Sequence, residues 1–417
     1  MDVVATKYVR KKPKLSVLAP ENLSDPYPYF RYLHESAPVY YDSSSQAWVV
    51  AKYEYIASML KDDRMSVNRY DAICLELSDL HKEMNQSIRK SLSNFLLNID
   101  DPKHARLRRL TKDIFLESSV SQMRGDIQAI ANELISIQQV GYQFDIVSDY
   151  AYPLPIRAIC RILGLAEYDL EEIKQLSDDV SVYIGSAGRA PNCVPITFEA
   201  LKRLNDIFLP IVYARREDPQ NDLISKMVSL RSTNDVLDDD EVVANCVLFL
   251  VAGFETVTNL IACGVLALLE NKEELAKLIQ DPTLIGGVID ESLRYYPPVN
   301  RTARLCKQDM EVGHHVIKKG EIVILLLGAA NRDPNCFASP DNFNINRVSK
   351  AKVLSFGSGP HHCIGHLLAR LEGEIGIQTL LRHLATHFDF KSYLSEWRGD
   401  SKFRGLQSLR LKPLSDQ

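Results

Sequence analysis

A single cysteine stands in a short stretch whose residues are suited to presenting a sulfur atom to a ligand. Residues 356–365, FGSGPHHCIG, place three glycines, one proline and two histidines around Cys363. Gly357 and Gly359 allow backbone conformations that a Cβ would forbid and let a flat group approach closely, while Pro360 stiffens the turn. Apolar residues at roughly helical spacing follow the cysteine. We therefore expect its sulfur at the start of a helix, where the helix dipole favours a thiolate.

Three roles are open to Cys363 on these residues alone. It could be a small buried hydrophobic side chain, as most lone cysteines are. It could bind zinc together with His361 and His366, although their spacing matches none of the usual zinc pairs. It could also be the thiolate ligand of a haem iron, which needs a glycine-rich loop against the ring, one cysteine and a cationic group for a propionate.

The whole ten-residue stretch meets the pattern F-G-x-G-x-H-x-C-x-G without exception. This pattern resembles the haem-binding signature of the cytochrome P450 family. The resemblance implies that Cys363 is the axial ligand of the iron of haem b and that His361 contacts a propionate. It also implies that Phe356, Gly357 and Gly365 lie against the cofactor.

A second informative stretch is nearly continuously apolar and runs over residues 242–269. It is long enough to cross a membrane, but polar residues interrupt its centre, which predicts a buried core helix instead. Within it, AGFET resembles the A-G-x-E-T element that lines the oxygen side of the haem in this family. The resemblance implies cofactor contacts for Ala252 and Gly253 and proton delivery by Glu255 and Thr256. The alternative is a threonine bonded to its own backbone and a glutamate in a salt bridge.

The two propionates of haem require cationic groups from several segments, and arginine suits carboxylates because its planar fork matches them. His104 and Arg108 are four residues apart and share one face of a predicted helix. They match the family's H-x-x-x-R element, and Arg304 follows a double proline at the expected distance. The resemblance implies that these three residues and His361 hold the propionates, although Arg301 lies near Arg304.

A third motif, ESLR, places Glu291 and Arg294 on one helix face. Such a pair is weak evidence by itself, because most are solvated. Its position before YYPP, and the later NRDP and P-D-x-F-x-x-x-R elements, match the order expected of the family. We interpret Glu291 and Arg294 as structural and expect Arg347 to join them.

The elements that must position these residues are mainly helical. Residues 54–294 and 363–385 show helical periodicity, whereas strand formers gather near 38–53, 299–327 and 395–411. The prediction is a mainly α chain with minor β. The resemblance implies the cytochrome P450 fold, with haem between the long central helix and the cysteine loop and small sheets at one side. We expect residues 1–417 to form one haem-binding domain.

Composition excludes several other classes. The chain has 417 residues, 46% hydrophobic and 25% charged, with a net charge of -5, which argues against a general nucleic-acid binder. The basic N-terminus has no apolar signal region, so we expect a cytoplasmic protein without a membrane anchor. The eight cysteines form no C-x-x-C pair, and we expect no disulfides.

The resemblance implies a monooxygenase that uses O2 on a substrate C–H bond, with the look of the soluble bacterial branch. By analogy with the family, residues 69–97, 180–195, 249–256, 299–302 and 397–404 should line the substrate pocket. Their mixture of aliphatic and polar residues suggests a sizeable, largely apolar substrate, such as a polyketide, a fatty-acyl or carrier-bound chain, or a terpenoid. Two other functions are a haem-thiolate sensor, which would leave the lid-like residues 185–191 without a purpose, and a haem-free binding protein.

The electrons must come from another protein, because the chain has neither a dinucleotide fingerprint nor a cysteine set for an iron–sulfur cluster. We expect a monomer that receives them from a ferredoxin or flavodoxin with its reductase. Residues 103–112 leave Lys103, Arg106, Arg109 and Lys112 on helix faces other than that of His104 and Arg108. The family resemblance places this helix on the thiolate side, so we predict that Arg106, Arg109 and Lys112 steer the acidic partner.

Overall fold

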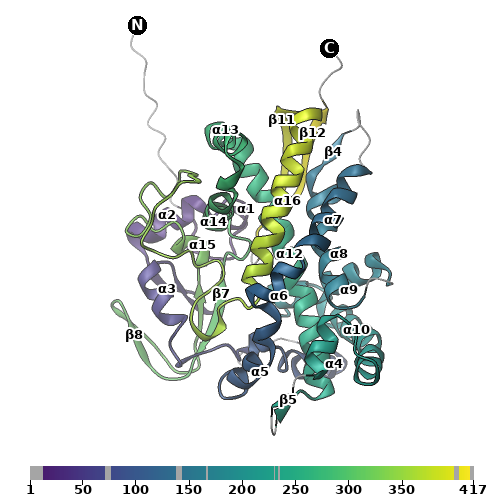
Figure 1. Cartoon of the computed structure of the whole chain (residues 1–417). Helices are drawn as coiled ribbons and strands as arrows, with labels where there is room; N and C mark the ends of the chain where they lie inside the picture. Colours follow the sequence, from purple (N-terminus) through teal and green to yellow (C-terminus); the bar gives the residue numbers. More distant parts are fainter. Residues whose placement is uncertain are drawn as a thin grey trace.

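The structure is a computed structural model, which describes residues 13–70, 77–137, 143–165, 168–229, 231–232, 235–398 and 403–413. Helices make up most of this part of the chain (Figure 1). The longer ones are α4 (Asp79–Leu92), α7 (Arg124–Ser136), α9 (Leu170–Ser186), α10 (Cys193–Glu217), α12 (Asp239–Glu270) and α16 (His366–His387). The shorter ones are α1 (Pro20–Ser24), α2 (Tyr27–Ser36), α3 (Tyr53–Met59), α5 (Lys103–Thr111), α6 (Glu117–Gln122), α8 (Pro153–Ile162), α11 (Leu223–Ser229), α13 (Lys272–Gln280), α14 (Ile285–Tyr295) and α15 (Leu327–Ala330).

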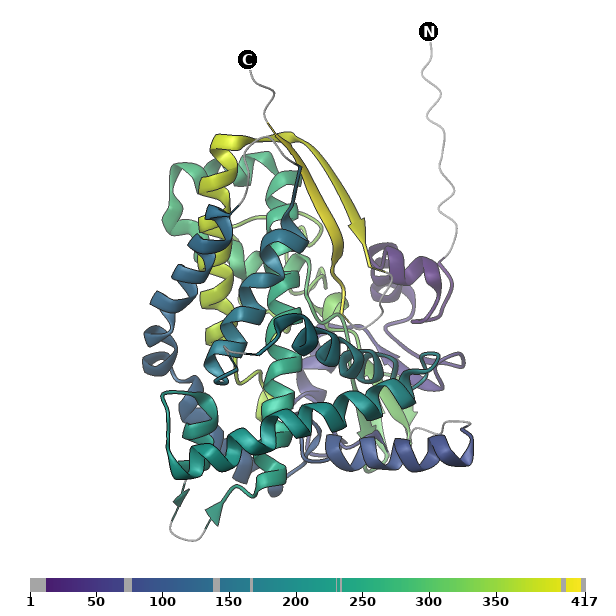
Figure 2. The ribbon, with the colours of Figure 1, turned by 90° about the vertical axis from the view of Figure 1, so that its right-hand side faces the viewer.

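The strands form small sheets, which confirms the mainly α class with minor β. A five-stranded sheet has the order β1-β2-β10-β7-β3, and its strands are β1 (Val39–Asp42), β2 (Ala47–Val50), β3 (Met65–Ser66), β7 (Thr302–Cys306) and β10 (Ile322–Leu325). A three-stranded sheet has the order β11-β12-β4, from β11 (Phe388–Trp397), β12 (Leu406–Pro413) and β4 (Phe144–Asp145). Its long strands β11 and β12 lie at the top in Figure 2. The strand formers near 38–53 form the antiparallel hairpin of β1 and β2, in which Val39 is opposite Val50.

Some strand boundaries differ from the prediction. Within the strand-forming region 299–327, part of the chain forms a separate hairpin of β8 (Met310–Val312) and β9 (His315–Ile317). Gly313 turns the chain there with a φ of 61°, a conformation that favours glycine. The predicted helical region 54–294 also contains β3, β4, β5 (Arg231–Ser232) and β6 (Asp235–Val236). These two-residue strands are too short to show a period in the sequence.

The long apolar stretch is the central helix α12, which begins at a capping box. The Asp238 side chain accepts from the backbone N–H of Glu241, and the Glu241 carboxylate accepts from the backbone N–H of Asp238. The helix is long and apolar enough to cross a membrane, but 83% of its most apolar window is buried inside the protein. This burial confirms the predicted core helix.

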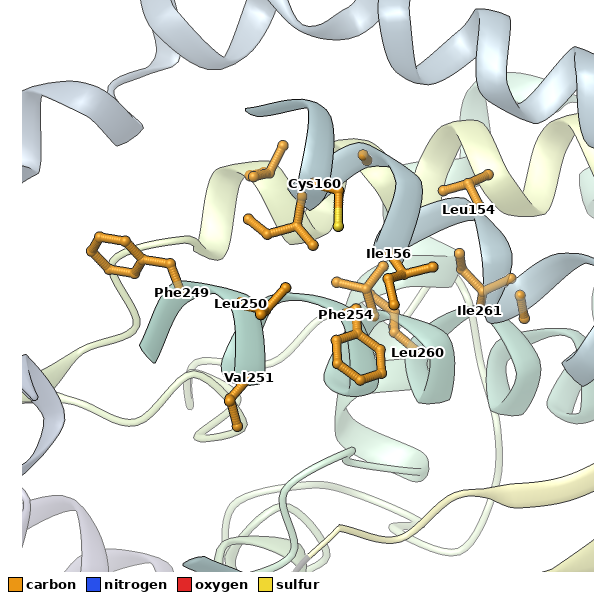
Figure 3. Close-up of a cluster of buried hydrophobic side chains, with 14 of the residues drawn as sticks. Leu154, Ile156, Cys160, Phe249, Leu250, Val251, Phe254, Leu260 and Ile261 are labelled. Carbon is orange, nitrogen blue, oxygen red and sulfur yellow. The ribbon is translucent and has the colours of Figure 1, made fainter. Parts of the chain in front are cut away.

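Helix α12 packs against α8, α10, α14 and α16, so it connects the main helical layers. Figure 3 shows Leu154, Ile156 and Cys160 of α8 near Phe254 and Ile261 of α12. A Cβ on Gly253 would lie 3.3 Å from Cγ1 of Ile159. The glycine therefore lets α8 and α12 approach closely next to the predicted oxygen-side residues.

Glu291 and Arg294 form a buried network in α14, as predicted. The Arg294 side chain is 0% exposed, and its Nη2 lies 2.7 Å from Oε1 of Glu291. Arg347 donates from Nε to the same carboxylate at 3.0 Å. Arg294 also donates to the carbonyl oxygens of Asn331 and Pro340. The network thus fixes the segment that leads to the cysteine loop.

Candidate functional site

The cysteine loop is a tight turn that ends three residues before α16. The backbone N–H of Cys363 donates to the carbonyl of Phe356 at 2.8 Å, which closes the loop. Gly357 and Gly359 have φ values of 70° and 72°, in the region that favours glycine. A Cβ on Gly359 would lie 2.7 Å from the carbonyl oxygen of Leu60. The structure therefore explains why two glycines precede the cysteine.

The expected preference of Cys363 for the thiolate is wrong for the protein chain alone. Burial raises the pKa of the Cys363 thiol, although the backbone N–H of Gly365 and the charge of Arg108 act in the opposite direction. The cost of burying a charge is larger here than the combined effect of that hydrogen bond and of the Arg108 charge. Coordination to a metal would deprotonate such a thiol.

Four predicted cationic residues converge beside the loop. The rings of His104 and His361 lie 4.0 Å apart, and all four residues line the cavity that reaches Cys363. Burial, followed by repulsion from His104 and Arg304, lowers the pKa of His361 to about 3. Burial lowers the pKa of Arg108. The structure therefore brings together His104, Arg108, Arg304 and His361, as predicted.

Arg304 is the most deeply placed arginine of this cationic cluster. Burial, and then the charge of Arg69, lower the pKa of Arg304 to about 10. Its Nη1 donates to the hydroxyl of Thr302 at 3.0 Å and to the carbonyl of Ala303 at 2.9 Å. Arg69 lies at the start of a segment predicted to line the substrate pocket and does line the cavity, but it belongs to no motif, so its place beside the propionate residues was not predicted. Arginines that line one cavity together form a site suited to carboxylates.

The oxygen-side residues of α12 separate into two groups. Ala252, Gly253 and Thr256 line the cavity, and the Thr256 hydroxyl donates to the carbonyl of Ala252 at 2.9 Å. Glu255 is buried and is not part of the cavity lining. Its Oε1 accepts from Nη1 of Arg398 at 3.0 Å. The structure therefore shows the backbone-bonded threonine and the ion-paired glutamate that the sequence left as an alternative.

The Arg398 contact was missed because it joins segments far apart in sequence. Arg398 follows β11, and its Nη2 also donates to Oδ1 of Asn259 at 2.8 Å. Glu255 and Asn259 are one helical turn apart on α12. A sequence pattern can place those two residues on one face, but only the fold brings Arg398 to them.

One cavity of about 720 Å³ contains these groups. Each segment predicted to line the pocket contributes at least one residue to its wall, including Arg69, Ile184, Phe249, Val299 and Phe403. Positions 71–76 and 399–402 of those segments lie outside the described residues. The wall also contains apolar residues that no motif indicated, namely Phe115, Ile159, Leu248, Ile322 and Ile324. The chamber is therefore mainly apolar, with its positive charge in a few arginines.

The alternative zinc role of Cys363 finds no support in the part of the chain that the structure describes. No three His, Cys, Asp or Glu side chains there form a group that could hold a metal ion. His366, the third residue of the possible zinc set, instead has its Nδ1 3.0 Å from the carbonyl of Cys363. The seven described cysteines are free, and Cys74 lies outside the described residues.

Helix α5 and its C-cap carry Arg106, Arg109 and Lys112, the three residues predicted to steer the redox partner, and one of them is engaged in an ion pair. Arg106 binds Glu241 of α12, with Nη1 and Oε1 2.8 Å apart. Its charge is therefore balanced by Glu241 across two helices, and we leave it out of the proposed docking surface. Arg109 and Lys112 are exposed, so they stay as predicted docking residues.

Taken together, fold and site describe a mainly helical protein with one large cavity between a cysteine loop and a central helix. The family model described as Cytochrome P450 matches residues 196–395. The chain is 34% identical over 397 residues to the biotin biosynthesis cytochrome P450 of Bacillus subtilis (strain 168), covering 94% of this chain and 98% of that protein. It is 34% identical over 377 residues to the polyketide biosynthesis cytochrome P450 PksS of the same organism, covering 87% and 88%.

Solved structures that are similar to this chain are also cytochromes P450. P450BioI in complex with hexadec-9Z-enoic acid ligated acyl carrier protein superposes with a TM-score of 0.86 at 32% identity, covering 94% of this chain and 99% of that one. CYP109E1 from Bacillus megaterium in complex with corticosterone has a TM-score of 0.80 at 29% identity, covering 94% and 99%. The chain belongs to the cytochrome P450 family and is a monooxygenase of the oxidoreductase class, a family that uses haem.

Proposed function

We propose that this chain binds haem b through Cys363 and inserts one oxygen atom of O2 into a sizeable, largely apolar substrate by hydroxylation or epoxidation. The observation that carries the proposal is that Cys363, the four-residue cationic cluster and Thr256 all line one cavity. We further propose that residues 1–417 form a single haem-binding domain.

The residues present fit such a group. Haem needs a sulfur ligand, room for a flat ring and cations for two propionates. Cys363 supplies the sulfur, while Gly253, Phe356, Gly357 and Gly365 line the cavity near it. The buried Nε2 of His104 has no hydrogen-bond partner in the described structure, so it is available for a carboxylate. His104, Arg108, Arg304 and His361 would hold the propionates.

Haem bound through a thiolate supplies the hard chemistry, which is the cleavage of the O–O bond at the expense of two electrons and two protons. The chain's own residues prepare for it. The Thr256 hydroxyl lines the cavity and could exchange its hydrogen bond to Ala252 for one to a water there, which would hold a proton on the side of the cavity where haem would be used. Glu255 is next in line and can pass protons to it only after its pairing with Arg398 loosens. The apolar wall excludes other water from the reacting carbon.

The substrate class and the redox partner extend this proposal. The relatives named for biotin and polyketide biosynthesis, and the acyl carrier protein complex, support an apolar chain that is free or carrier-bound. We propose that a ferredoxin or flavodoxin with its reductase supplies the electrons to a cytoplasmic, monomeric enzyme. A terpenoid is the other substrate class that such a chamber would suit.

A ferrous carbonyl difference spectrum tests the proposed ligand. The purified protein should be red and show the strongly red-shifted Soret band of thiolate ligation, and Cys363→Ser should lose that band. Cys336→Ser is the matched control, because Cys336 is a free cysteine of similar exposure that does not line the cavity. An unchanged red-shifted band in Cys363→Ser would show that another residue is the ligand.

A further inference from the structure

The cavity that contains Cys363 extends to the N-terminal segment of the chain. Leu18, just before α1, lines the cavity and is 38% exposed. The turn between β1 and β2 contributes Ser45 and Gln46 to the same wall, and Gln46 is exposed. Connecting segments of this kind run over the surface of a protein, and the purple N-terminal elements lie at the right-hand edge of the molecule in Figure 2. The N-terminal segment and the hairpin turn therefore form part of the rim of the cavity.

Residues 14–18, which we call the N-terminal strap, are fixed to this turn through one buried carboxylate. Oδ2 of Asp42 accepts from the backbone N–H of Val17 at 2.9 Å. Oδ1 of Asp42 accepts from the backbone N–H of Ser44 at 2.9 Å and from the Ser44 hydroxyl at 2.6 Å. Burial alone would raise the pKa of the Asp42 carboxyl, but these hydrogen bonds outweigh burial and lower that pKa. A single ionised side chain thus shapes the turn and holds the strap against it.

In the described part of the chain, the strap has few other attachments to the hairpin. The hydroxyls of Ser16 and Ser44 lie 2.6 Å apart, and Val17 packs in the small apolar cluster of α2 and the β1–β2 hairpin. The two leucines of the strap, Leu15 and Leu18, are both exposed. A segment with so few buried contacts opens locally at a lower free-energy cost than the whole protein unfolds.

The strap also has hydrogen bonds that do not involve the hairpin. Nδ2 of Asn22 in α1 donates to the carbonyl oxygens of Lys14 and Ser16 at 2.8 and 2.7 Å. The backbone N–H of Ser16 donates to the carbonyl of Lys14 at 2.9 Å. These bonds stay when Asp42 releases Val17, so the strap can leave the turn without losing its own shape.

We propose that the N-terminal strap is a gate at an entrance to the cavity, that Asp42 is its latch, and that bulky apolar ligands pass between Leu18 and the β1–β2 turn. This inference rests on the proposed binding of haem and substrate in the cavity. A small ligand needs less room than a bulky one, so the state of the strap should affect bulky ligands most. A gate slows entry and exit alike, so it changes the rates of binding and not the affinity.

The contact between Ser16 and Ser44 allows the gate to be locked. Their hydroxyl oxygens are 2.6 Å apart, close to the S–S bond length of about 2.05 Å, so Ser16→Cys combined with Ser44→Cys should form a disulfide. Stopped-flow measurements of the Soret shift would follow the binding of imidazole and of 1-dodecylimidazole to the holoenzyme. Oxidation should slow 1-dodecylimidazole about tenfold, which adds about 1.4 kcal/mol to the barrier, and should leave imidazole unchanged. Dithiothreitol should reverse the effect, and each single cysteine variant is a control that cannot form this bridge.

A second pair of variants changes the size of the entrance without changing the latch. Leu18→Trp enlarges a side chain of the rim, so it should slow the entry and exit of 1-dodecylimidazole and leave its affinity unchanged. Leu15→Trp is the matched control, because Leu15 is 43% exposed in the same strap but does not line the cavity. It should change neither ligand. This comparison decides the question even where the disulfide does not form.

Hydrogen exchange tests the latch without any added ligand. Asp42→Asn keeps the size of the side chain but removes its charge and one acceptor oxygen, so the backbone amide of Val17 should exchange faster. The backbone amide of Ala51, which donates to the carbonyl of Pro38 at the other end of the hairpin, should keep its rate. Faster exchange at both amides would show that the whole hairpin has loosened, and equal exchange at Val17 would show that Asp42 is no latch. Either result would overturn the inference.

The ligand rates provide the remaining refutations. Unchanged 1-dodecylimidazole rates in the oxidised double variant, equal slowing of imidazole, or equal effects of Leu18→Trp and Leu15→Trp would each place the entrance elsewhere. The ferrous carbonyl band is measured first on every preparation. Absence of the band in the unmodified protein would refute the proposed function, whereas a normal band with unchanged rates would refute only the gate.

Discussion

The buried carboxylate of Glu291 should contribute strongly to stability, and Glu291→Gln tests this. The carboxylate accepts from Nε and Nη2 of Arg294 at 2.8 and 2.7 Å, from Nε of Arg347 at 3.0 Å and from the backbone N–H of Asn344 at 2.9 Å. The substitution keeps the shape of the side chain but leaves both guanidinium groups without their counter-charge.

The expected magnitude follows from burial. The side chains of Arg294 and Glu291 are 0% and 3% exposed, and removing one partner of such a pair costs about 3–5 kcal/mol. The neighbouring residue provides a matched control. Asp290 pairs with Arg370, but its side chain is 60% exposed, so Asp290→Asn should cost less than about 1 kcal/mol.

The assay is urea unfolding of the holoenzyme, followed by far-ultraviolet circular dichroism and by the Soret band. Glu291→Gln should also lose haem at lower urea, because Arg294 holds the carbonyl of Asn331 and the Asn331 side chain accepts from the backbone N–H of Leu354 at 2.8 Å, just before the cysteine loop. If the free energies of unfolding of Glu291→Gln and Asp290→Asn differ by less than about 1 kcal/mol, burial of the ion pair does not determine the loss of stability and the reasoning is wrong.

Two further predictions concern turnover. Thr256→Ala should divert reducing equivalents to peroxide and lower the yield of oxygenated product. Thr258→Ala is the control, because it removes a similar hydrogen bond to the backbone away from the cavity, and it should not change the yield. Equal coupling in both variants would refute the proton role of Thr256. Reversing Arg109 and Lys112 together to Glu should slow reduction by an acidic redox partner and flatten its salt dependence in stopped-flow experiments, with substrate binding unchanged. Reduction at the unmodified rate in low salt would place the docking surface elsewhere.

Local sequence was sufficient for features whose cause is local. The cysteine loop could be predicted because a turn with two positive φ angles requires glycine at Gly357 and Gly359. The placement of His104 and Arg108 on one cavity-facing side of α5 followed from the helical period alone. The central helix could be predicted from the length of its apolar run, and the α14 pair from the three-residue spacing of Glu291 and Arg294.

Tertiary structure determined what depends on distant segments. Arg398 pairs with Glu255 across 143 positions of sequence, and Arg106 binds Glu241 across 135. Neither pair has a periodic signal, because ion pairs between elements depend on how those elements pack. The thiol of Cys363 is another example, since the sequence indicated a helix start but not the burial that raises its pKa. The sequence thus determined the residue types of the site, while packing decided which charges are balanced and which are left for a ligand.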